Sequence, residues 1–261
     1  MIIEDLTPEY ESLYCVCMED WSEEMAEAGD HKEKWYCRMK DRGLRVKLAK
    51  DDHGEVGGMI QYLPIEQSFV DGRDLYFVLC IFVHGHKKGR GDFSKRGMGQ
   101  ALLKAAEEDA RGLGARGVVV WGLIIPAFMR ASWFKRQGYI KVDRMGIQAL
   151  LWKPFSDDAV PPRWIHQKKK PELITGKVTV SGFINGWCPA QNIAFERAKR
   201  AAGEFPNQVE FIQYDTHERE TFLNWGISDA LFVDKKAVWT GPPPSYEKIK
   251  RIIEKRVKNL K

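Results

Sequence analysis

The chain has 261 residues, 44% hydrophobic and 30% charged, which is ordinary for a soluble globular protein and long enough to favour two domains. Lys and Arg total 41 against 36 Asp and Glu, so the formal charge of +5 is small for this length. Because nucleic-acid-binding domains concentrate positive charge on one face, this balance argues against nucleic acid as a partner.

Neither a membrane span nor an export signal is visible. No apolar stretch approaches the ~20 residues that cross a bilayer, and residues 1–5 lack the basic start and apolar core of a signal peptide. We therefore expect a cytoplasmic protein without a membrane partner. The five cysteines, an odd number at irregular spacing, argue against a secreted disulfide framework and are expected to be reduced.

Three of these cysteines raise the question of a metal site. Cys15, Cys17 and Cys37 fall on two neighbouring predicted helices, and thiolates can hold a soft metal ion. Residues two apart on a helix point to different faces, however, and no fourth ligand is evident. We therefore expect no metal site and interpret these cysteines as buried apolar residues.

Residues 1–153 alternate between strand and helix patterns, which predicts a mixed α+β domain. Its central element is the apolar run at 75–83, typical of a strand buried on both faces. The other expected elements are, in chain order, a strand at 1–4, helices at 8–18 and 31–41, strands at 45–50 and 55–63, a helix from about Gly97, a strand at 118–121, a helix near 128–136 and a hairpin-like pair ending at Trp152.

Residues 154–172 are predicted to form a linker, because prolines and a lysine run replace periodic apolar positions there. Residues 173–261 predict a second, different domain with the element order βαβαββα. Its expected elements are a strand around 178–184, a helix after Cys188, a strand at 209–214, a short helix near 218–224, a hairpin at 231–239 and a terminal helix around 249–257.

A phosphate-binding site is predicted where the strand at 75–83 gives way to the next helix. The connecting loop is rich in glycine and basic residues, and Lys95-Arg96-Gly97-Met98-Gly99 leads directly into the helix. A helix start offers backbone N–H groups and a positive dipole end to an anion. The glycines leave room for a phosphate, and the two basic residues add charge. The segment is neither a P-loop nor a Rossmann turn, and in isolation it also fits an ordinary tight turn.

The order of elements in residues 1–153 resembles that of the GNAT family of N-acetyltransferases. Three segments carry the resemblance. They are Phe82-Val83, the helix start at 95–103, and residues 133–139 (W-F-K-R-Q-G-Y), which are similar to the family's Phe-Tyr-x-x-x-Gly-Phe element.

The resemblance implies that acetyl-CoA is the cosubstrate and that an amine of unknown identity is the acceptor. The pyrophosphate is expected on the backbone amides of residues 96–100, and the pantetheine arm beside the central strand. The residues implied to bind the cofactor are Phe82, Val83, Lys95, Arg96, Gly97, Met98, Gly99 and Gln100.

The sequence departs from the family pattern at the position that handles the proton. The tyrosine that often protonates the leaving thiolate corresponds to Phe134, which cannot donate, and the usual asparagine falls near Ala127. Cys80 and His84, on or beside the central strand, are candidate catalytic replacements. A strand cysteine also fits a plain core position, and a loop histidine also fits a solvated one.

The second half resembles a minimal thioredoxin-like fold and is most similar to the YoaP-like domains that follow GNAT domains. Cys188 stands at its first strand-to-helix turn, where a helix N-terminus favours a thiolate, so it is a candidate reactive thiol. A dithiol site is not expected, because C-P-A-Q lacks the second cysteine of Cys-x-x-Cys, and Asp229-Ala230 stands where the fold has its cis-proline.

Together these features predict a two-domain α+β acetyltransferase that moves an acetyl group from acetyl-CoA to an amine. Two alternatives stay open. One is a thiol-handling protein that uses Cys188, and the other is an acyl-CoA-binding module without turnover.

Overall fold

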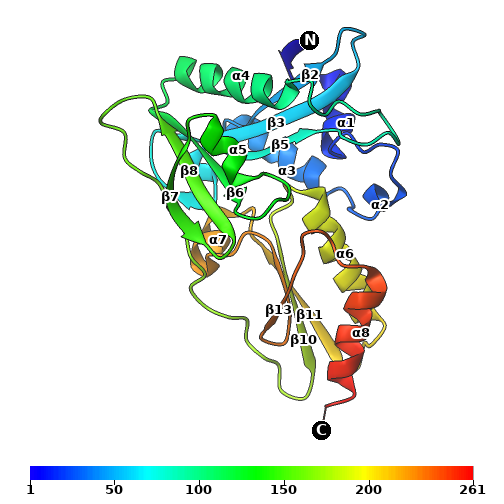
Figure 1. The fold of residues 1–261 in the computed structure, drawn as a ribbon. Coiled ribbons are helices and arrows are strands. Elements are labelled where there is room, and N and C mark those ends of the chain that lie inside the picture. The colour runs from blue at the N-terminus through cyan, green and yellow to red at the C-terminus, as the bar shows by residue number, and fades with distance from the viewer. Residues whose placement is uncertain (261) are drawn as a thin grey trace. The chain divides into compact units, whose positions relative to one another are not determined.

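A long mixed sheet organises the first unit, which comprises residues 1–21 and 37–165 of the 260 that this computed structural model describes (Figure 1). The strands lie in the order β1-β2-β3-β5-β6-β8-β7, and all neighbours are antiparallel except β5 and β6. Their bounds are β1 (Ile2–Asp5), β2 (Arg45–Lys50), β3 (Val56–Pro64), β5 (Tyr76–Val83), β6 (Gly117–Leu123), β7 (Ile140–Met145) and β8 (Gln148–Pro154). This is the mixed sheet that the sequence predicts.

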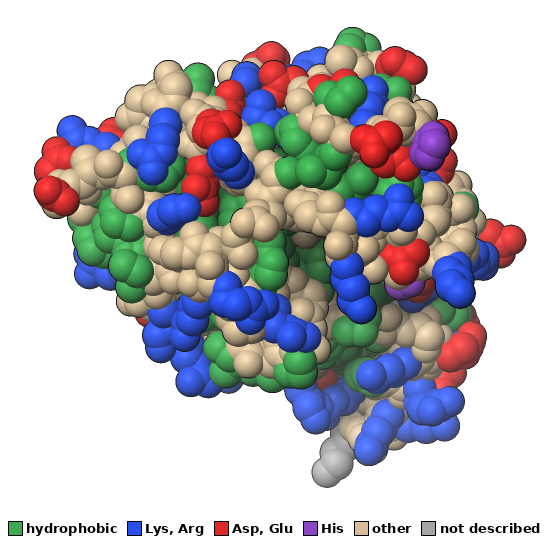
Figure 2. Space-filling model, turned by 45° about the horizontal axis from the view of Figure 1, so that its top comes forward, with side chains coloured by type: hydrophobic (Ala, Val, Ile, Leu, Met, Phe, Trp, Pro, Cys, Tyr) green, Lys and Arg blue, Asp and Glu red, His purple; other side chains and the backbone are tan. Residues whose placement is uncertain are grey.

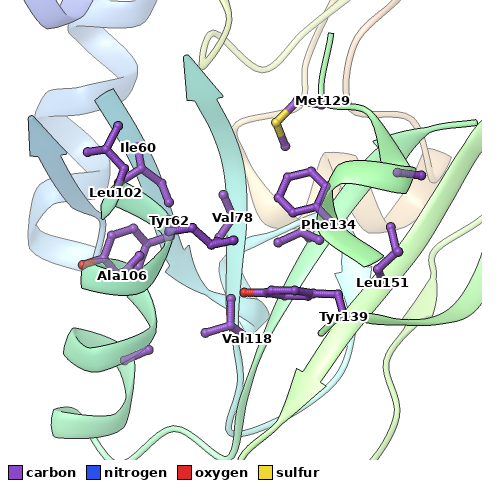
Figure 3. Packing of buried hydrophobic residues seen from close by; sticks show 14 of the residues in the cluster. Ile60, Tyr62, Val78, Leu102, Ala106, Val118, Met129, Phe134, Tyr139 and Leu151 are labelled. Carbon is purple, nitrogen blue, oxygen red and sulfur yellow. The ribbon is translucent and has the colours of Figure 1, made fainter. Parts of the chain in front are cut away.

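Helix α4 (Met98–Gly112) covers one face of this sheet (Figure 1). Its buried residues Leu102, Ala106 and Ala110 recur at helical spacing and belong to the main hydrophobic core with residues of β3, β5 and β6 (Figure 3). Burying this apolar surface fixes the helix on the sheet and therefore fixes where its N-terminus lies.

Two carboxylates on α4 set its position further. Asp109 accepts both a two-pronged contact from Arg45, at 3.0 and 3.1 Å, and the hydroxyl of Tyr62 at 2.6 Å. Burial by itself would raise the pKa of Asp109, but the hydrogen bonds from Arg45 and Tyr62 lower it overall. On another side of the helix, Glu107 accepts the ammonium group of Lys153 at 2.7 Å. The helix is thus tied to β2, β3 and β8.

Two helices of the first unit are shorter than the sequence predicts. The expected helix at 8–18 divides into a 3-10 turn (Pro8–Tyr10) and α1 (Glu11–Cys15), and α5 begins only at Ala131 and ends at Arg136. Residues 124–130 form the loop between β6 and α5, although part of this segment was expected to belong to the helix near 128–136. Further 3-10 turns lie at Lys40–Arg42 and Ile65–Gln67.

Two short strands have no counterpart among the predicted elements. β9 (Arg163–Trp164) lies inside the expected linker and pairs with β4 (Val70–Asp71). Trp164 is only 6% exposed, so burial of its ring holds this part of residues 154–172 on the first unit.

The second unit contains a smaller sheet, in the strand order β11-β10-β12-β13. β10 and β11 are parallel, and the other neighbours are antiparallel. The element order is the predicted βαβαββα: β10 (Val178–Ile184), α6 (Pro189–Gly203), β11 (Val209–Asp215), α7 (Arg219–Trp225), β12 (Ala230–Val233), β13 (Lys236–Val238) and α8 (Tyr246–Val257). Side chains of α6 and α8 share one hydrophobic cluster with the sheet, while Phe183 and Trp225 belong to a separate one.

Residues 22–36 belong by their contacts to the second unit, whereas the sequence suggests one N-terminal domain over 1–153. They contain α2 (Glu23–Ala26) and the first six residues of α3 (His31–Met39). Arg197 of α6 is only 8% exposed and donates to Glu24 at 2.9 Å and to Glu27 at 2.6 Å. A buried guanidinium must be paired, so these contacts join the segment to α6.

Candidate functional site

The central strand β5 loses its neighbour on one side before it ends. β5 pairs with β6 only over Tyr76–Val78, although it continues to Val83. Its register against β3 also shifts at Leu79, which forms a bulge. Because an extended ligand can pair with a strand edge as an additional strand, the segment from Leu79 to Val83 is a candidate binding edge.

Two side chains contact this edge. The indole N–H of Trp121 donates to the Leu79 carbonyl at 2.7 Å, and the Ile81 N–H donates to the thioether sulfur of Met129 at 3.4 Å. Met129 is 7% exposed and has φ 51°, which is uncommon for a residue other than glycine. Since a thioether is a weak acceptor, a carbonyl oxygen of a ligand could replace it on the Ile81 N–H.

The start of α4 lies beside the same edge. Gly97, with φ 83°, precedes the helix, and a Cβ built on it would meet no described atom within 4 Å. A Cβ on Gly99 would lie 3.8 Å from Val83 and 3.7 Å from Trp133. No acidic residue occupies the described first turn, whose N–H groups have no partner within the helix itself. The predicted phosphate cradle and the open part of β5 are therefore adjacent.

The other residues predicted to bind the cofactor differ in what they can offer. Lys95, Arg96 and Gln100 are exposed at the cradle, although a guanidinium nitrogen of Arg96 lies 3.8 Å from Asp51. Met98 is only 2% exposed, and its side chain belongs to the core. Its contribution to a ligand site is therefore limited to its backbone N–H.

Phe82 and Val83 flank the edge from opposite faces. Val83 packs against the core cluster that contains α4, on the side of Gly99. The ring of Phe82 lies 6.4 Å from the ring of His84 and 6.5 Å from that of Phe128. Of these two predicted residues, Val83 thus belongs to the cradle and Phe82 to an aromatic region on the other face.

The basic loop before α4 is a small hairpin, with a bridge between Gly85 and Asp92. Arg90 is held inside it by Asp20 at 3.3 Å and Glu55 at 3.4 Å. The positive charge of Arg90 is therefore paired with these two carboxylates and is not directed to the cradle.

His84 and Cys80, the candidate catalytic residues, are both buried. One ring nitrogen of His84 lies 2.6 Å from the Gly91 carbonyl, and the other accepts the indole N–H of Trp21 at 3.2 Å. Because an indole N–H can only donate, these contacts fit a neutral imidazole that holds the hairpin in place. Cys80 is 6% exposed and lies opposite Gln61 of β3.

Phe134, which the sequence resemblance matches to a proton-donating tyrosine, lies in the core. It is 1% exposed, and its ring centroid lies 4.9 Å from that of Trp133 and 5.9 Å from that of Tyr139. Figure 3 shows Phe134 and Tyr139 among the buried residues of the core. The hydroxyl of Tyr139 donates to Glu107 at 3.0 Å, and burial together with that carboxylate raises the pKa of Tyr139 well above its usual range. Tyr139 therefore keeps its proton and is no substitute acid.

Sequence reasoning missed the groups on the β5 edge. The accessible N–H of Ile81 depends on the bulge at Leu79, and no apolar periodicity reveals a bulge. Trp121 is marked only by its position at the end of an apolar run, and Met129 lies in a segment whose expected helix is a loop.

Cys188 directly precedes α6, as predicted. It is half-buried, and its carbonyl accepts the N–H of Asn192 at 3.1 Å. Beside it, the indole N–H of Trp187 donates to Asp229 at 3.0 Å, and the backbone N–H of Asn185 donates to the same carboxyl at 3.0 Å. The turn that carries the thiol is thus held by the half-buried Asp229 carboxyl, and loss of solvation raises the pKa of this group.

The described residues give little sign of other ligand types. Across residues 1–260, no group of three or more His, Cys, Asp and Glu side chains is arranged to hold a metal ion. No helix in that range is both long and apolar enough to cross a membrane. Figure 2 shows Lys and Arg side chains together with Asp and Glu on the face drawn.

Comparison with known proteins supplies the family context. The family model described as "Acetyltransferase (GNAT) family" matches residues 2–139, slightly more than half of the chain. This range contains the cradle, the open edge of β5 and Phe134. No curated protein matches the chain significantly.

Two solved structures each cover about 60% of the chain. A GNAT family N-acetyltransferase (YhbS) from Escherichia coli in complex with CoA is 18% identical, covers 60% of this chain and 82% of its own, and gives a TM-score of 0.43. A PaiA N-acetyltransferase from Thermoplasma acidophilum in complex with coenzyme A is 17% identical, with coverages of 59% and 99% and a TM-score of 0.42.

Proposed function

The chain belongs to the acetyltransferase (GNAT) family, and from this premise we propose that it transfers an acetyl group from acetyl-CoA to an amine. One observation carries the assignment to particular residues. The open helix start at Gly97 and Gly99 lies next to Val83, where β5 no longer pairs with β6. A pyrophosphate and the extended arm attached to it need these two features side by side.

In the proposed complex, the pyrophosphate oxygens accept hydrogen bonds from the backbone N–H groups of residues 96–100. Lys95 and Arg96 add positive charge from an exposed position. The pantetheine arm pairs with β5 from Leu79 to Val83, in place of the contacts that Trp121 and Met129 make there. Moving away from the edge of β5 costs each of these two side chains only one weak or moderate hydrogen bond.

The reaction then needs a donor to the thioester oxygen. We assign this role to the Ile81 N–H, which points out of the sheet edge toward Met129. A neutral amine attacks the carbonyl carbon, so a C–N bond forms and the C–S bond breaks. Phe134 offers no proton, so the proton released by the amine nitrogen reaches the thiolate through water, and His84 is assigned to holding the loop.

The remaining assignments concern the whole chain. We propose a GNAT-like domain over residues 1–153, a linker at 154–172 and a thioredoxin-like, YoaP-like domain over 173–261, in a cytoplasmic protein. The βαβαββα order and the parallel pair β10–β11 support the second domain assignment. Within this proposal the second domain influences acceptor access or choice and takes no part in the chemistry.

The proposal is tested by titrating the full chain with acetyl-CoA in a calorimeter and then measuring CoA released with a panel of amines. We expect saturable binding, with a dissociation constant between roughly 1 μM and 1 mM, and no comparable binding of AMP, which lacks the pyrophosphate. CoA is best followed by chromatography, because the chain's own five cysteines would react with thiol reagents. Failure of acetyl-CoA to bind would overturn the proposal.

A further inference from the structure

Five aromatic rings follow one another along the far end of β5 and β6. Trp21 contacts His84 at a centroid distance of 6.0 Å, and His84 contacts Phe82 at 6.4 Å. Phe82 is followed by Phe128 at 6.5 Å, and Phe128 by Trp121 at 6.4 Å. We call these five residues the aromatic row. All of them belong to the first unit.

The aromatic row reaches the proposed reaction centre. Phe82 follows Ile81 directly, Phe128 precedes Met129, and Met129 contacts the Ile81 N–H at 3.4 Å. Trp121 contacts the next edge position, the Leu79 carbonyl, at 2.7 Å. A molecule that approaches a thioester at Ile81 therefore comes close to Phe82, Phe128 and Trp121, the part of the aromatic row beside this edge.

Part of this region is exposed in a way that a soluble protein usually avoids. Phe128 is 48% exposed, and its loop neighbours Ile124 and Ile125 are 48% and 44% exposed. Large apolar side chains grouped on one loop beside a reaction centre indicate a binding surface rather than chance exposure. An aromatic ring packs against other rings edge-to-face or offset, which is the kind of contact that the row offers.

The charges in the flanking segments point to the same ligand. Residues 75–91 and 117–142 contain no Asp or Glu, although these residues make up 36 of the chain's 261. The nearby carboxylates of Asp20 and Glu55 are bound to Arg90. These segments offer no carboxylate that could pair with a substrate carrying several positive charges. An amine with a single charge and an apolar body needs fewer such partners, so the missing carboxylates weaken its binding less.

From these observations we propose that the acceptor is a small aromatic amine, with its primary amino group on a short chain attached to the ring. This inference rests on the proposed acetyltransferase function and narrows its substrate. The ring packs against Phe128 and Phe82, and the amino group reaches the thioester carbonyl at Ile81.

The test compares acceptors at saturating acetyl-CoA with the full chain. We expect kcat/KM for 2-phenylethylamine to exceed that for 2-cyclohexylethylamine, its saturated analogue, by at least threefold, and that for spermidine by at least a hundredfold. Phe128→Ala should raise KM for phenylethylamine at least tenfold, while acetyl-CoA binding stays unchanged. Leu113→Ala removes another exposed apolar side chain (51% exposed, after α4) and should change neither value.

The outcomes separate the two proposals. Preference for spermidine, no transfer to any aromatic amine, or an unchanged KM in Phe128→Ala would overturn the aromatic acceptor while acetyl-CoA binding still supported the transferase. If the unmodified chain does not bind acetyl-CoA, both the transferase proposal and the aromatic acceptor are overturned.

Discussion

In each unit of the molecule, a strand and a loop lead into a 15-residue helix. The surroundings of the two helix N-termini differ. Neither α4 nor α6 has a side-chain cap on its N-terminus, and neither carries an acidic residue in its first turn. Around α4 the space beside Gly97 is open, whereas a Cβ on Gly186, just before α6, would lie 3.0 Å from the His31 carbonyl.

The second helix start is also closed by its own side chains. Pro189 at the first helical position has no N–H to offer, and the buried amide of Asn192 donates to the Gly186 carbonyl at 3.0 Å. The same helix dipole is present in both units, so the dipole alone does not make a ligand site. An anion needs N–H groups that it can reach, and of these two helix starts that of α4 combines them with an open strand edge.

The largest effect is expected from closing the first helix start. Gly99→Glu places a carboxylate within the first turn of α4, on the side that faces Val83 and Trp133. The side chain would occupy the space proposed for the pyrophosphate and repel its charge, so we expect the dissociation constant of acetyl-CoA to rise at least a thousandfold, about 4 kcal/mol. Calorimetric titration measures this change directly.

A matched control lies at the other end of the same helix. Gly112→Glu introduces the same side chain on α4, where a Cβ would meet no described atom within 4 Å. It should leave acetyl-CoA binding within twofold of the unmodified chain. Equal affinities for the Gly99 and Gly112 variants would mean that the cradle does not hold the cofactor.

These two helix starts also show which features of a candidate site can be predicted from the sequence and which cannot. Glycines and basic residues before a helix predict the cradle, because local composition determines whether a backbone can be approached. The closure of α6 involves His31, more than 150 positions earlier in the chain, and no local pattern indicates that residues 22–36 join the second unit. Likewise, the Ile81 N–H is available as a donor because of a bulge in β5. The pairing of β5 with β3 produces this bulge, and the residue pattern of β5 does not indicate it.

A smaller effect concerns the pH dependence of stability in the second unit. Burial raises the pKa of Asp229, from its usual 3.8, despite donors from Ser228, Asn185 and Trp187. A carboxyl with a raised pKa contributes stability that is fully present below its unfolded value and is lost as pH rises through the folded one. The advantage of the unmodified chain over Asp229→Asn should therefore shrink from pH 4 to pH 8.

Urea unfolding of both proteins at several pH values, followed by tryptophan fluorescence, measures that difference. Asp229→Asn keeps the size of the side chain and removes its titration. It also replaces one accepting oxygen with an amide nitrogen and so weakens the hydrogen bonds at Asp229. That loss does not depend on pH, so the change of the difference with pH isolates the titration of the carboxyl. A difference in the free energy of unfolding that stays constant, or grows, with pH would show that burial does not raise the pKa of the carboxyl at the Cys188 turn.

The smallest effect is expected at Cys188 itself. Cys188→Ser retains a small polar side chain before α6 and removes the thiol, so an enzyme whose chemistry depends on acetyl-CoA at Ile81 should keep kcat/KM within twofold for its best amine. A thiol-dependent reaction would instead lose activity by several orders of magnitude, because a hydroxyl at that position is not ionised at neutral pH. Measuring transfer and acetyl-CoA affinity in the same variant separates the two cases. A large loss of turnover with unchanged affinity would move the reactive centre to the closed helix start and reverse the contrast between the two units.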